Sequence, residues 1–163
     1  MDDYRFELAS PRDASRIAAL SRHLIEDGLR PSWPADRVLC HIKRTDSVVL
    51  AARWQTRWVT QLVGFAIMQF GDEHAHLNLL AVESEHQRHG VGRQLMSWLH
   101  ETARVAGTFV LSLELRASNV GAQRFYESMG YEAGAVMRGY YQAVEDAQRM
   151  SCDLRVSRGS LTA

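Results

Sequence analysis

Residues 79–92 read LLAVESEHQRHGVG, and this stretch decides how the rest of the chain is interpreted. Its apolar start ends a strand that is expected from His74 to Val82. Its last six residues, Gln87–Gly92, form a loop with two glycines directly before an amphipathic helix. The first N–H groups of a helix have no partner inside the helix, and the helix dipole favours a negative charge there. The sequence therefore predicts an anion-binding loop between a strand and a helix.

The residue types in this loop suit a phosphate group. Gly90 and Gly92 carry no side chain that would hold an anion away from the backbone, and Arg88 and Arg93 add charge at the edges. A P-loop would require lysine followed by serine or threonine after its last glycine, and a dinucleotide fingerprint would require glycine where Leu95 stands. A strand-to-helix turn that merely uses glycine remains an alternative.

Regular secondary structure is predicted on the C-terminal side of the loop. Apolar residues recur at helical spacing over 91–106, and Gly107 is placed to end that helix. Residues 108–116 alternate, so that leucines occupy one face of a strand while Glu114 and Arg116 occupy the other. Three further elements are expected: a helix over 119–129 and strands over 131–137 and 149–156.

The N-terminal half supplies the remaining elements of an α/β fold. Strands are expected over 4–8, 48–52 and 62–68, and helices over 10–25 and 35–43, with the polar stretch 53–61 as a connection. The element order β-α-α-β-β-β-α-β-α-β-β predicts a mixed sheet of about seven strands flanked by about four helices. The chain contains no repeat or linker, so residues 1–163 are expected to form a single domain.

Composition excludes several classes of protein. The chain has 163 residues, 46% hydrophobic and 23% charged, as is typical of a globular protein. Its 19 basic residues equal its 19 acidic residues, so a nucleic-acid-binding protein is not expected. No apolar run approaches the ~20 residues of a membrane span, and the acidic start is not expected to act as a secretory signal. Cys40 and Cys152 are isolated, which indicates reduced thiols of a cytoplasmic protein.

Two stretches resemble the GNAT acetyltransferase superfamily. That family's signature, Gln/Arg-x-x-Gly-x-Gly/Ala before a helix, matches Gln87–Gly92. Residues 113–131, LELRASNVGAQRFYESMGY, resemble the RimI type, the N-terminal alanine acetyltransferases of a ribosomal protein. Gly139-Tyr140-Tyr141 is similar to the same branch, so that the strong match spans residues 79–141. The resemblance implies a GNAT-like fold.

The resemblance also implies acetyl-CoA as the co-substrate, with no metal, and gives roles to the matching residues. Glu114 matches the general base and Tyr126 the general acid of the RimI type, and Asn119 matches a side chain that bonds the cofactor. The strand end that bonds the pantetheine arm matches Leu80, Ala81 and Val82. The pyrophosphate loop matches Gln87, Arg88, His89, Gly90, Val91, Gly92 and Arg93.

Each catalytic role has a structural alternative. Glu114 can remove the proton of an amine, and burial at a strand end is expected to raise its pKa; otherwise it is an exposed carboxylate paired with Arg116. Tyr126 can protonate the departing thiolate, or it is an amphipathic tyrosine on the buried face of a helix. Asn119 can cap that helix, and this is compatible with a contact to the cofactor.

Other polar and aromatic residues do not identify the acceptor substrate. His74 and His76 point the same way on one strand, either as polar residues on the substrate-facing or exposed side or as an alternative base. With no third ligand in reach, a metal site is not expected. Five aromatic residues either line the acceptor cleft or pack a homodimer: Trp33, Trp54, Trp58, Tyr140 and Tyr141.

The expected function is transfer of an acetyl group from acetyl-CoA to a primary amine, directly and through a tetrahedral intermediate. No activating partner is recognisable for either cysteine, so an acyl-cysteine is not expected. The acceptor is either a protein N-terminus or a small molecule, because the N-terminal half shows no feature of the RimI type. The alternative is a non-catalytic acyl-CoA-binding or interaction domain of the same fold.

Overall fold

The computed structural model describes residues 3–156 of the chain. Within this range it contains seven strands and four α-helices in the order that the sequence predicts. The chain divides into two compact units. The first comprises residues up to Gln69 together with 78–99, and the second comprises residues 70–77 together with those from His100 onward. Strand β4 (His74–Val82) and helix α3 (Val91–Ala106) contribute residues to both units.

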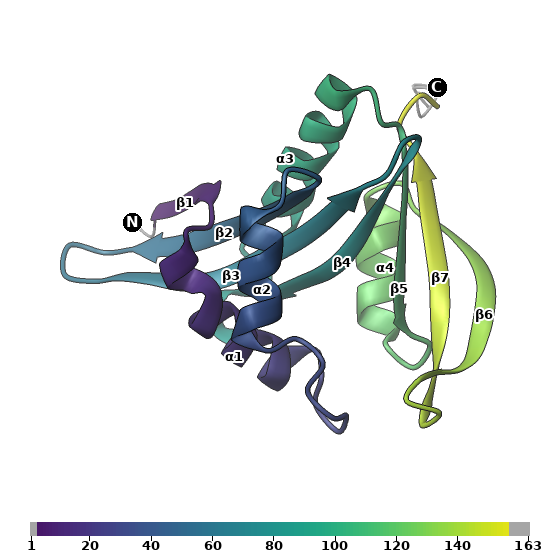
Figure 1. Cartoon of the computed structure of the whole chain (residues 1–163), viewed down its shortest axis with the longest axis horizontal. Helices are drawn as coiled ribbons and strands as arrows, with labels where there is room; N and C mark the ends of the chain where they lie inside the picture. The colour runs from purple at the N-terminus through teal and green to yellow at the C-terminus, as the bar shows by residue number, and fades with distance from the viewer. Residues whose placement is uncertain (1–2, 157–163) are drawn as a thin grey trace. The chain divides into compact units, whose positions relative to one another are not determined.

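Antiparallel strands form the sheet of the first unit (Figure 1). β1 (Asp3–Leu8) pairs with β2 (Ser47–Gln55), and β2 pairs with β3 (Thr60–Phe70). Most residues of β3 are buried, as expected for a strand covered on both faces.

Two helices pack on these strands. They are α1 (Ala14–Leu24) and α2 (Ala35–Lys43). Ile17 of α1 and Val38 of α2 are fully buried in one cluster with Phe65 and Ile67 of β3. The buried residues of α1 include Ala14, Ile17, Ala18 and Ser21, which recur at helical spacing.

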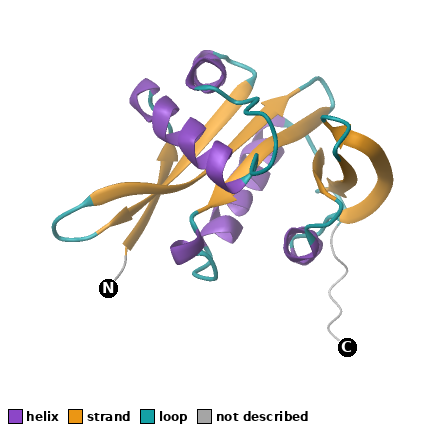
Figure 2. Ribbon diagram, turned by 90° about the horizontal axis from the view of Figure 1, so that it is seen from below, coloured by secondary structure: helices purple, strands orange, loops and turns teal. Residues whose placement is uncertain are grey.

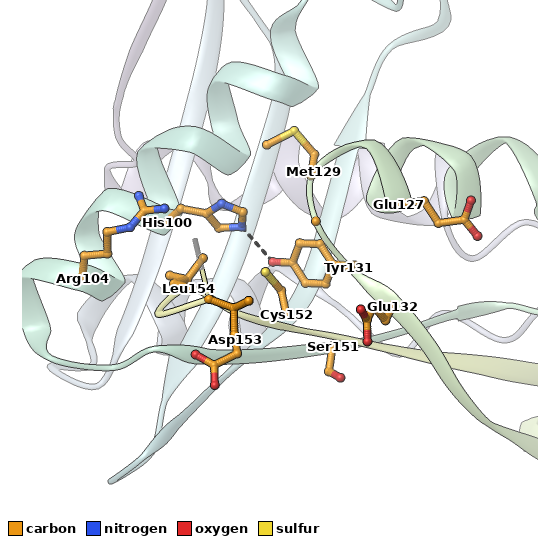
Figure 3. A pocket seen from close by; sticks show the side chains of 12 residues that line it. His100, Arg104, Glu127, Met129, Tyr131, Glu132, Ser151, Cys152, Asp153 and Leu154 are labelled. Atoms are coloured by element: carbon orange, nitrogen blue, oxygen red, sulfur yellow. Dashed lines mark hydrogen bonds between the residues drawn. The ribbon is translucent and has the colours of Figure 1, made fainter. Parts of the chain in front are cut away.

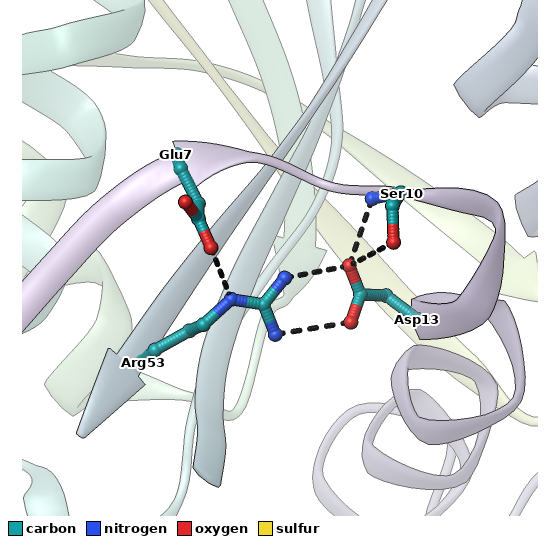
Figure 4. A network of polar contacts seen from close by, with 4 residues as sticks. All are labelled: Glu7, Ser10, Asp13 and Arg53. Atoms are coloured by element: carbon teal, nitrogen blue, oxygen red, sulfur yellow. Dashed lines mark hydrogen bonds and ion pairs between the residues drawn. The ribbon is translucent and has the colours of Figure 1, made fainter. Parts of the chain in front are cut away.

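A polar network fixes the start of α1 against β2 (Figure 4). The register of β2 and β3 shifts between Ala52 and Arg53. The guanidinium of Arg53 donates to both carboxylate oxygens of Asp13, at 3.0 and 2.7 Å, and to Glu7 at 2.5 Å. The amide of Ser10 donates to Asp13 at 2.8 Å. Because Asp13 immediately precedes α1, this network sets where the helix begins.

The second unit is built around β5 (Val110–Arg116). It pairs parallel with the first half of β4 and antiparallel with β7 (Glu145–Asp153). β6 (Glu132–Tyr141) pairs antiparallel with β7 and follows α4 (Val120–Ser128). Helices and strands thus interleave along the chain. Figure 2 shows the helices in purple and the strands in orange.

The predicted α/β class and mixed sheet are confirmed. The hydrogen-bonded strand order is β1-β2-β3-β4-β5-β7-β6. The sheet is mixed because β4 and β5 are parallel whereas β1 and β2 are antiparallel. The extent of a single acetyltransferase domain over 1–163 stays a prediction.

Several element boundaries differ from those expected. The polar stretch 53–61 is mostly strand, because β2 extends to Gln55 and β3 begins at Thr60. Cross-strand pairing overrides the polarity of these residues. A 3-10 turn over Pro11–Asp13 precedes α1, so the helix begins at Ala14, later than the start predicted at residue 10. The last two strands, β6 and β7, form a hairpin. β6 extends to Tyr141, beyond the predicted end at residue 137, and β7 begins at Glu145, before the predicted start at residue 149.

Candidate active site

The loop after β4 has the geometry of an anion-binding turn. β4 ends at Val82, a 3-10 turn covers Ser84–His86, and α3 begins at Val91. Between them, Arg88 and Gly90 have backbone φ angles of 62° and 81°. Glycine adopts this left-handed region without steric cost, whereas a residue with a side chain adopts it only at a cost in energy. The backbone conformation at position 90 therefore suits glycine, and the backbone of Arg88 is strained.

Hydrogen bonds shape the backbone of this loop. Gln87 Nε2 donates to the carbonyl oxygen of Val82 at 2.9 Å, and His89 Nδ1 donates to the carbonyl oxygen of Gln87 at 2.9 Å. The amide of Gln94 donates to the carbonyl oxygen of Gly90 at 3.0 Å. The backbone amides of α3 before Gln94 have no carbonyl acceptor inside the helix. Amides of this kind at the start of a helix can bind the oxygens of a phosphate group.

The charges next to the loop also suit an anion. Arg88 and Arg93 are exposed at its edges. Glu83, the carboxylate directly after β4, forms an ion pair with Arg16. The guanidinium of Arg16 also donates to the carbonyl oxygen of Leu62 at 3.4 Å. Repulsion between Glu83 and a bound anion is therefore reduced.

Gly64 of β3 permits a close approach to the end of β4. A Cβ atom at this position would lie 3.1 Å from the carbonyl oxygen of Ala81 and 3.3 Å from the side chain of Val82. Ala81 is buried, whereas Leu80 and Val82 are half-buried. Packing on β3 therefore fixes the backbone of residues 80–82.

In the second unit, Glu114 lies on the less buried face of β5. The predicted alternation is confirmed, because one face is buried and the other is half-buried. The buried face carries Leu111, Leu113 and Leu115, and the half-buried face carries Val110, Ser112, Glu114 and Arg116.

The carboxylate of Glu114 has partners from two neighbouring strands. His76 Nε2 of β4 forms a hydrogen bond with Glu114 Oε2. Arg149 lies opposite Glu114 in β7, with Nε 3.9 Å from Oε1. Arg116, which the sequence suggested as a partner, donates to Glu145 at 2.7 Å. The partners of Glu114 that the structure shows are His76 and Arg149, which come from the strands on either side of β5.

The pKa of Glu114 is lowered from its ordinary 4.5, which corrects the expectation that burial raises it. The hydrogen bond with His76 is the largest cause. Burial acts in the opposite direction but is outweighed, and the charges of His76 and Arg149 lower the pKa further. The carboxylate is therefore ionised at neutral pH although its side chain is only 9% exposed.

Tyr126 lies on the buried face of α4, where helical spacing places it. It is 7% exposed, and its ring packs edge-on against that of Tyr131 with centroids 5.6 Å apart. Burial raises the pKa of the phenol above its ordinary 10.0, and Tyr141 adds to this effect. The phenol therefore stays protonated at neutral pH and is available as a hydrogen-bond donor.

Tyr140 and Tyr141, at the end of β6, belong to the surroundings of Glu114. Burial raises the pKa of Tyr140, and the charge of Glu114 raises it further. The pKa of Tyr141 is raised by burial, by Tyr140 and by Glu114. The structure thus groups His76 and both tyrosines around Glu114. Sequence reasoning missed this grouping, because these residues come from different strands. The one available signal was that His74 and His76 lie two residues apart on one strand and therefore point to the same face.

Asn119 caps α4, which confirms the structural role predicted for it. Its side chain accepts a hydrogen bond from the amide of Ala122 at 3.1 Å. Its contact with a cofactor stays a prediction. Among residues 3–156, no three His, Cys, Asp or Glu side chains are grouped to hold a metal ion. No helix in that range is long and apolar enough to cross a membrane.

A pocket of about 660 Å³ opens at a different place in the second unit (Figure 3). His100 Nε2 and the hydroxyl of Tyr131 lie 2.9 Å apart in its wall. Burial lowers the pKa of His100 to about 4, and Arg104 contributes, so the imidazole is neutral. Cys152 also lines the pocket, and both it and Cys40 are free thiols. His100 and Tyr131 are therefore hydrogen-bonded to each other in this wall.

Comparison with known proteins agrees with this geometry. The family model described as "Acetyltransferase (GNAT) domain" matches residues 46–133. The [Ribosomal protein bS18]-alanine N-acetyltransferase of Salmonella typhimurium is 39% identical over 90 residues, which are 53% of this chain and 61% of that protein. The chain therefore spans less than two thirds of the length of this curated relative.

Solved structures share the fold over nearly the whole chain. The ribosomal-protein-S18-alanine N-acetyltransferase from Escherichia coli superposes with a TM-score of 0.78 at 24% identity, covering 99% of this chain and 100% of that one. Nourseothricin acetyltransferase superposes with a TM-score of 0.73 at 26% identity, covering 93% of this chain and 98% of that one. These two proteins differ in the acceptors that their names give.

Proposed function

Because the chain belongs to the GNAT acetyltransferase family, we propose that it transfers the acetyl group of acetyl-CoA to a primary amine. The observation that carries this proposal is the loop of residues 87–92 at the start of α3. It combines amides that have no acceptor inside the helix with exposed guanidinium groups, and such a site binds a diphosphate.

The first unit would hold the cofactor. The amides at the start of α3 and the side chains of Arg88, His89 and Arg93 bind the pyrophosphate of acetyl-CoA, while Gln87 braces the loop against Val82. The backbone of Leu80, Ala81 and Val82 bonds the pantetheine arm, and its amides stabilise the oxyanion of the tetrahedral intermediate. Asn119, which caps α4, is a further candidate for a contact with the cofactor.

Glu114 would act as the general base. The ammonium form of the acceptor loses a proton to the carboxylate, and the electron pair that remains on nitrogen attacks the thioester carbon. A lowered pKa makes Glu114 a weaker base but keeps it ionised and available at neutral pH. His76 thus holds the carboxylate in the form that accepts a proton.

Tyr126 would act as the general acid. The tetrahedral intermediate collapses, the carbon–sulfur bond breaks, and the thiolate of CoA takes the proton of the phenol. The nitrogen loses its second proton as the amide forms, and this proton restores the phenol, while the proton on Glu114 leaves to solvent. The raised pKa keeps the phenol protonated at neutral pH, although it also makes the phenol a weaker acid than an ordinary tyrosine. Transfer is direct, since Cys40 is exposed on α2 and Cys152 lies in the pocket beside His100.

A protein N-terminus is the first candidate for the acceptor. The Salmonella relative is named for acetylating an alanine of a ribosomal protein, and it matches this chain at 39% identity. A small amine is the second candidate, because nourseothricin acetyltransferase matches 93% of the chain. A homodimer and a cytoplasmic location are further proposals, the latter supported by two free thiols.

Thiol release from acetyl-CoA with a panel of peptides and small amines tests this function. Turnover with peptides that have a free N-terminus, and its loss when that N-terminus is blocked, would identify a protein acceptor. Turnover with small amines alone would identify the second candidate. If acetyl-CoA bound but no amine gave turnover, the non-catalytic acyl-CoA-binding alternative would replace the enzyme.

A further inference from the structure

The glycine loop, residues 87–92, is flanked in the first unit by aromatic residues to which the proposed function gives no role. Tyr4 of β1 and Trp54 of β2 lie directly opposite each other in the antiparallel pairing. Opposite residues project from the same face of a sheet, so the two side chains are neighbours. Both contact His86, the last residue of the turn before the loop.

These contacts surround the strained part of the loop. The hydroxyl of Tyr4 lies 2.8 Å from Nδ1 of His86, and the two rings meet edge-on at 5.8 Å. The rings of Trp54 and His86 are 5.2 Å apart. The ring of Tyr4 is also 6.4 Å from that of His89. Tyr4 therefore touches residues on both sides of Arg88.

Trp54 is held there by packing. Its indole N–H is buried and has no hydrogen-bond partner in the described part of the chain. A buried donor without a partner is unfavourable. Ring contacts such as that with His86 must therefore keep Trp54 in place.

We propose that Tyr4, supported by Trp54, is a positioning residue that holds the glycine loop in its anion-binding conformation through His86. Arg88 adopts a left-handed conformation that is costly for a residue with a side chain, so the loop needs support from outside itself. The bonds made by Gln87 and His89 tie the loop only to itself and to β4. The Tyr4–His86 bond ties it to a strand 82 residues away in the sequence.

This inference rests on the proposed function, and it predicts where the effect of a substitution falls. Support of the loop strengthens binding of ligands that carry a diphosphate. Donors that lack the diphosphate do not use the loop and are therefore unaffected. A residue that merely stabilised the fold would not discriminate between these ligands.

The test compares CoA binding by wild type, Tyr4→Phe, His86→Leu and the double variant, using isothermal titration calorimetry. Tyr4→Phe keeps the ring and removes the hydroxyl. The dissociation constant for CoA should rise about threefold to tenfold, as for loss of one hydrogen bond. The double variant should bind CoA no more weakly than His86→Leu alone, because Tyr4→Phe and His86→Leu each remove the same Tyr4–His86 hydrogen bond. The kcat/KM for S-acetylpantetheine, which lacks the diphosphate, should not change.

Tyr131→Phe is the matched control, because it removes a tyrosine–histidine hydrogen bond of 2.9 Å in the second unit. It should lower the unfolding temperature and leave the affinity for CoA unchanged. If Tyr4→Phe bound CoA as tightly as wild type, or lost activity equally with S-acetylpantetheine, the positioning role would be overturned. Failure of the wild type to bind CoA would instead overturn the proposed function together with this inference.

Discussion

Glu114 is an anion in this protein because His76 and Arg149 outweigh the effect of burial. A general base with a low pKa accepts a proton less readily, but it is fully ionised when an amine arrives. The neighbouring Tyr140 and Tyr141 have raised pKa values and therefore remain neutral donors beside the carboxylate. The residues around Glu114 thus determine its protonation state.

Glu114→Gln should lower kcat by about 10²-fold or more, which is the usual contribution of a general base. The dissociation constant for acetyl-CoA should change little, because the amide occupies nearly the same volume. Steady-state kinetics with a good acceptor measure the first quantity, and calorimetry measures the second. Glu127→Gln, an exposed position on α4, is the control and should retain full activity. Retention of full activity by Glu114→Gln would exclude Glu114 as the base.

His76→Asn should raise the pKa of Glu114, because the hydrogen bond with His76 is the largest cause that lowers it. A carboxylate base is active when ionised, so a higher pKa moves the acidic limb of the pH–rate profile to higher pH. The profile of kcat/KM from acidic to neutral pH measures this shift. His74→Asn, two residues away on the same strand and exposed, should leave the limb in place. Equal profiles for wild type and His76→Asn would contradict the coupling.

Sequence reasoning reached single residues only in part. The roles given to Glu114 and Tyr126 stay predictions, whereas burial confirmed the alternation around Glu114 and a hydrogen bond confirmed that Asn119 caps α4. It gave the wrong direction for the pKa of Glu114, because the partner of the carboxylate is 38 residues away. Contacts across parallel strands depend on register, which a single sequence does not specify.

At the scale of elements, a strand, a loop and a helix together create the proposed anion site. β4 supplies a strand end packed on β3 at Gly64, and α3 supplies amides at its first turn. The loop between them contains one strained residue, Arg88, and one glycine that suits its conformation, Gly90. This order was predictable, since glycines, charges and helical spacing are local signals. The aromatic support from β1 and β2 was not predictable, because strand pairing creates it.

Gly90→Ala should distort the loop, because φ at this position is 81°. No atom lies within 4 Å of the added methyl group, so the expected cost is backbone strain of about 1–2 kcal/mol rather than a clash. Thermal unfolding should shift down by roughly 2–4 °C per kcal/mol. Affinity for CoA should also fall, which calorimetry measures. Gly28→Ala, at φ 78° with similarly open space, should lower stability but leave CoA affinity unchanged.

Arg53→Met should destabilise the protein by about 3 kcal/mol, because it leaves the largely buried carboxylate of Asp13 without its main partner. Burial alone would raise the pKa of Asp13, but hydrogen bonds from Arg53 and the Ser10 amide lower it from 3.8. A lowered pKa contributes stability that is present above about pH 4 and is lost as pH falls further. The free energy of unfolding of the wild type should therefore fall in acid. That of Arg53→Met should depend less on pH in this range, because the variant lacks the main partner of Asp13.

Thermal unfolding as a function of pH measures this difference. Arg44→Met removes an exposed ion pair with Asp46, so it should cost less than about 1 kcal/mol. If Arg53→Met and Arg44→Met unfolded at the same temperature, the network shown in Figure 4 would have no special part in stability.

For the whole molecule, the fold and the family match those of known acetyltransferases. The family model covers residues 46–133, which include the glycine loop and Glu114. The first 45 residues lie outside this match, although they contribute β1, α1 and α2 to the first unit. Structural similarity extends over 99% of the chain. Shared fold does not determine the acceptor, which depends on the particular side chains around the reacting amine.

Transfer of an isotope-labelled acetyl group from acetyl-CoA to an amine is the decisive measurement for this protein. Mass spectrometry should find the label on the amine of an accepted peptide or small molecule, in equal amount to the free thiol of CoA. The label should not accumulate on the protein, because transfer is direct. Binding of acetyl-CoA, seen as a raised unfolding temperature, with no labelled product from any amine would show that the protein is not an acetyltransferase.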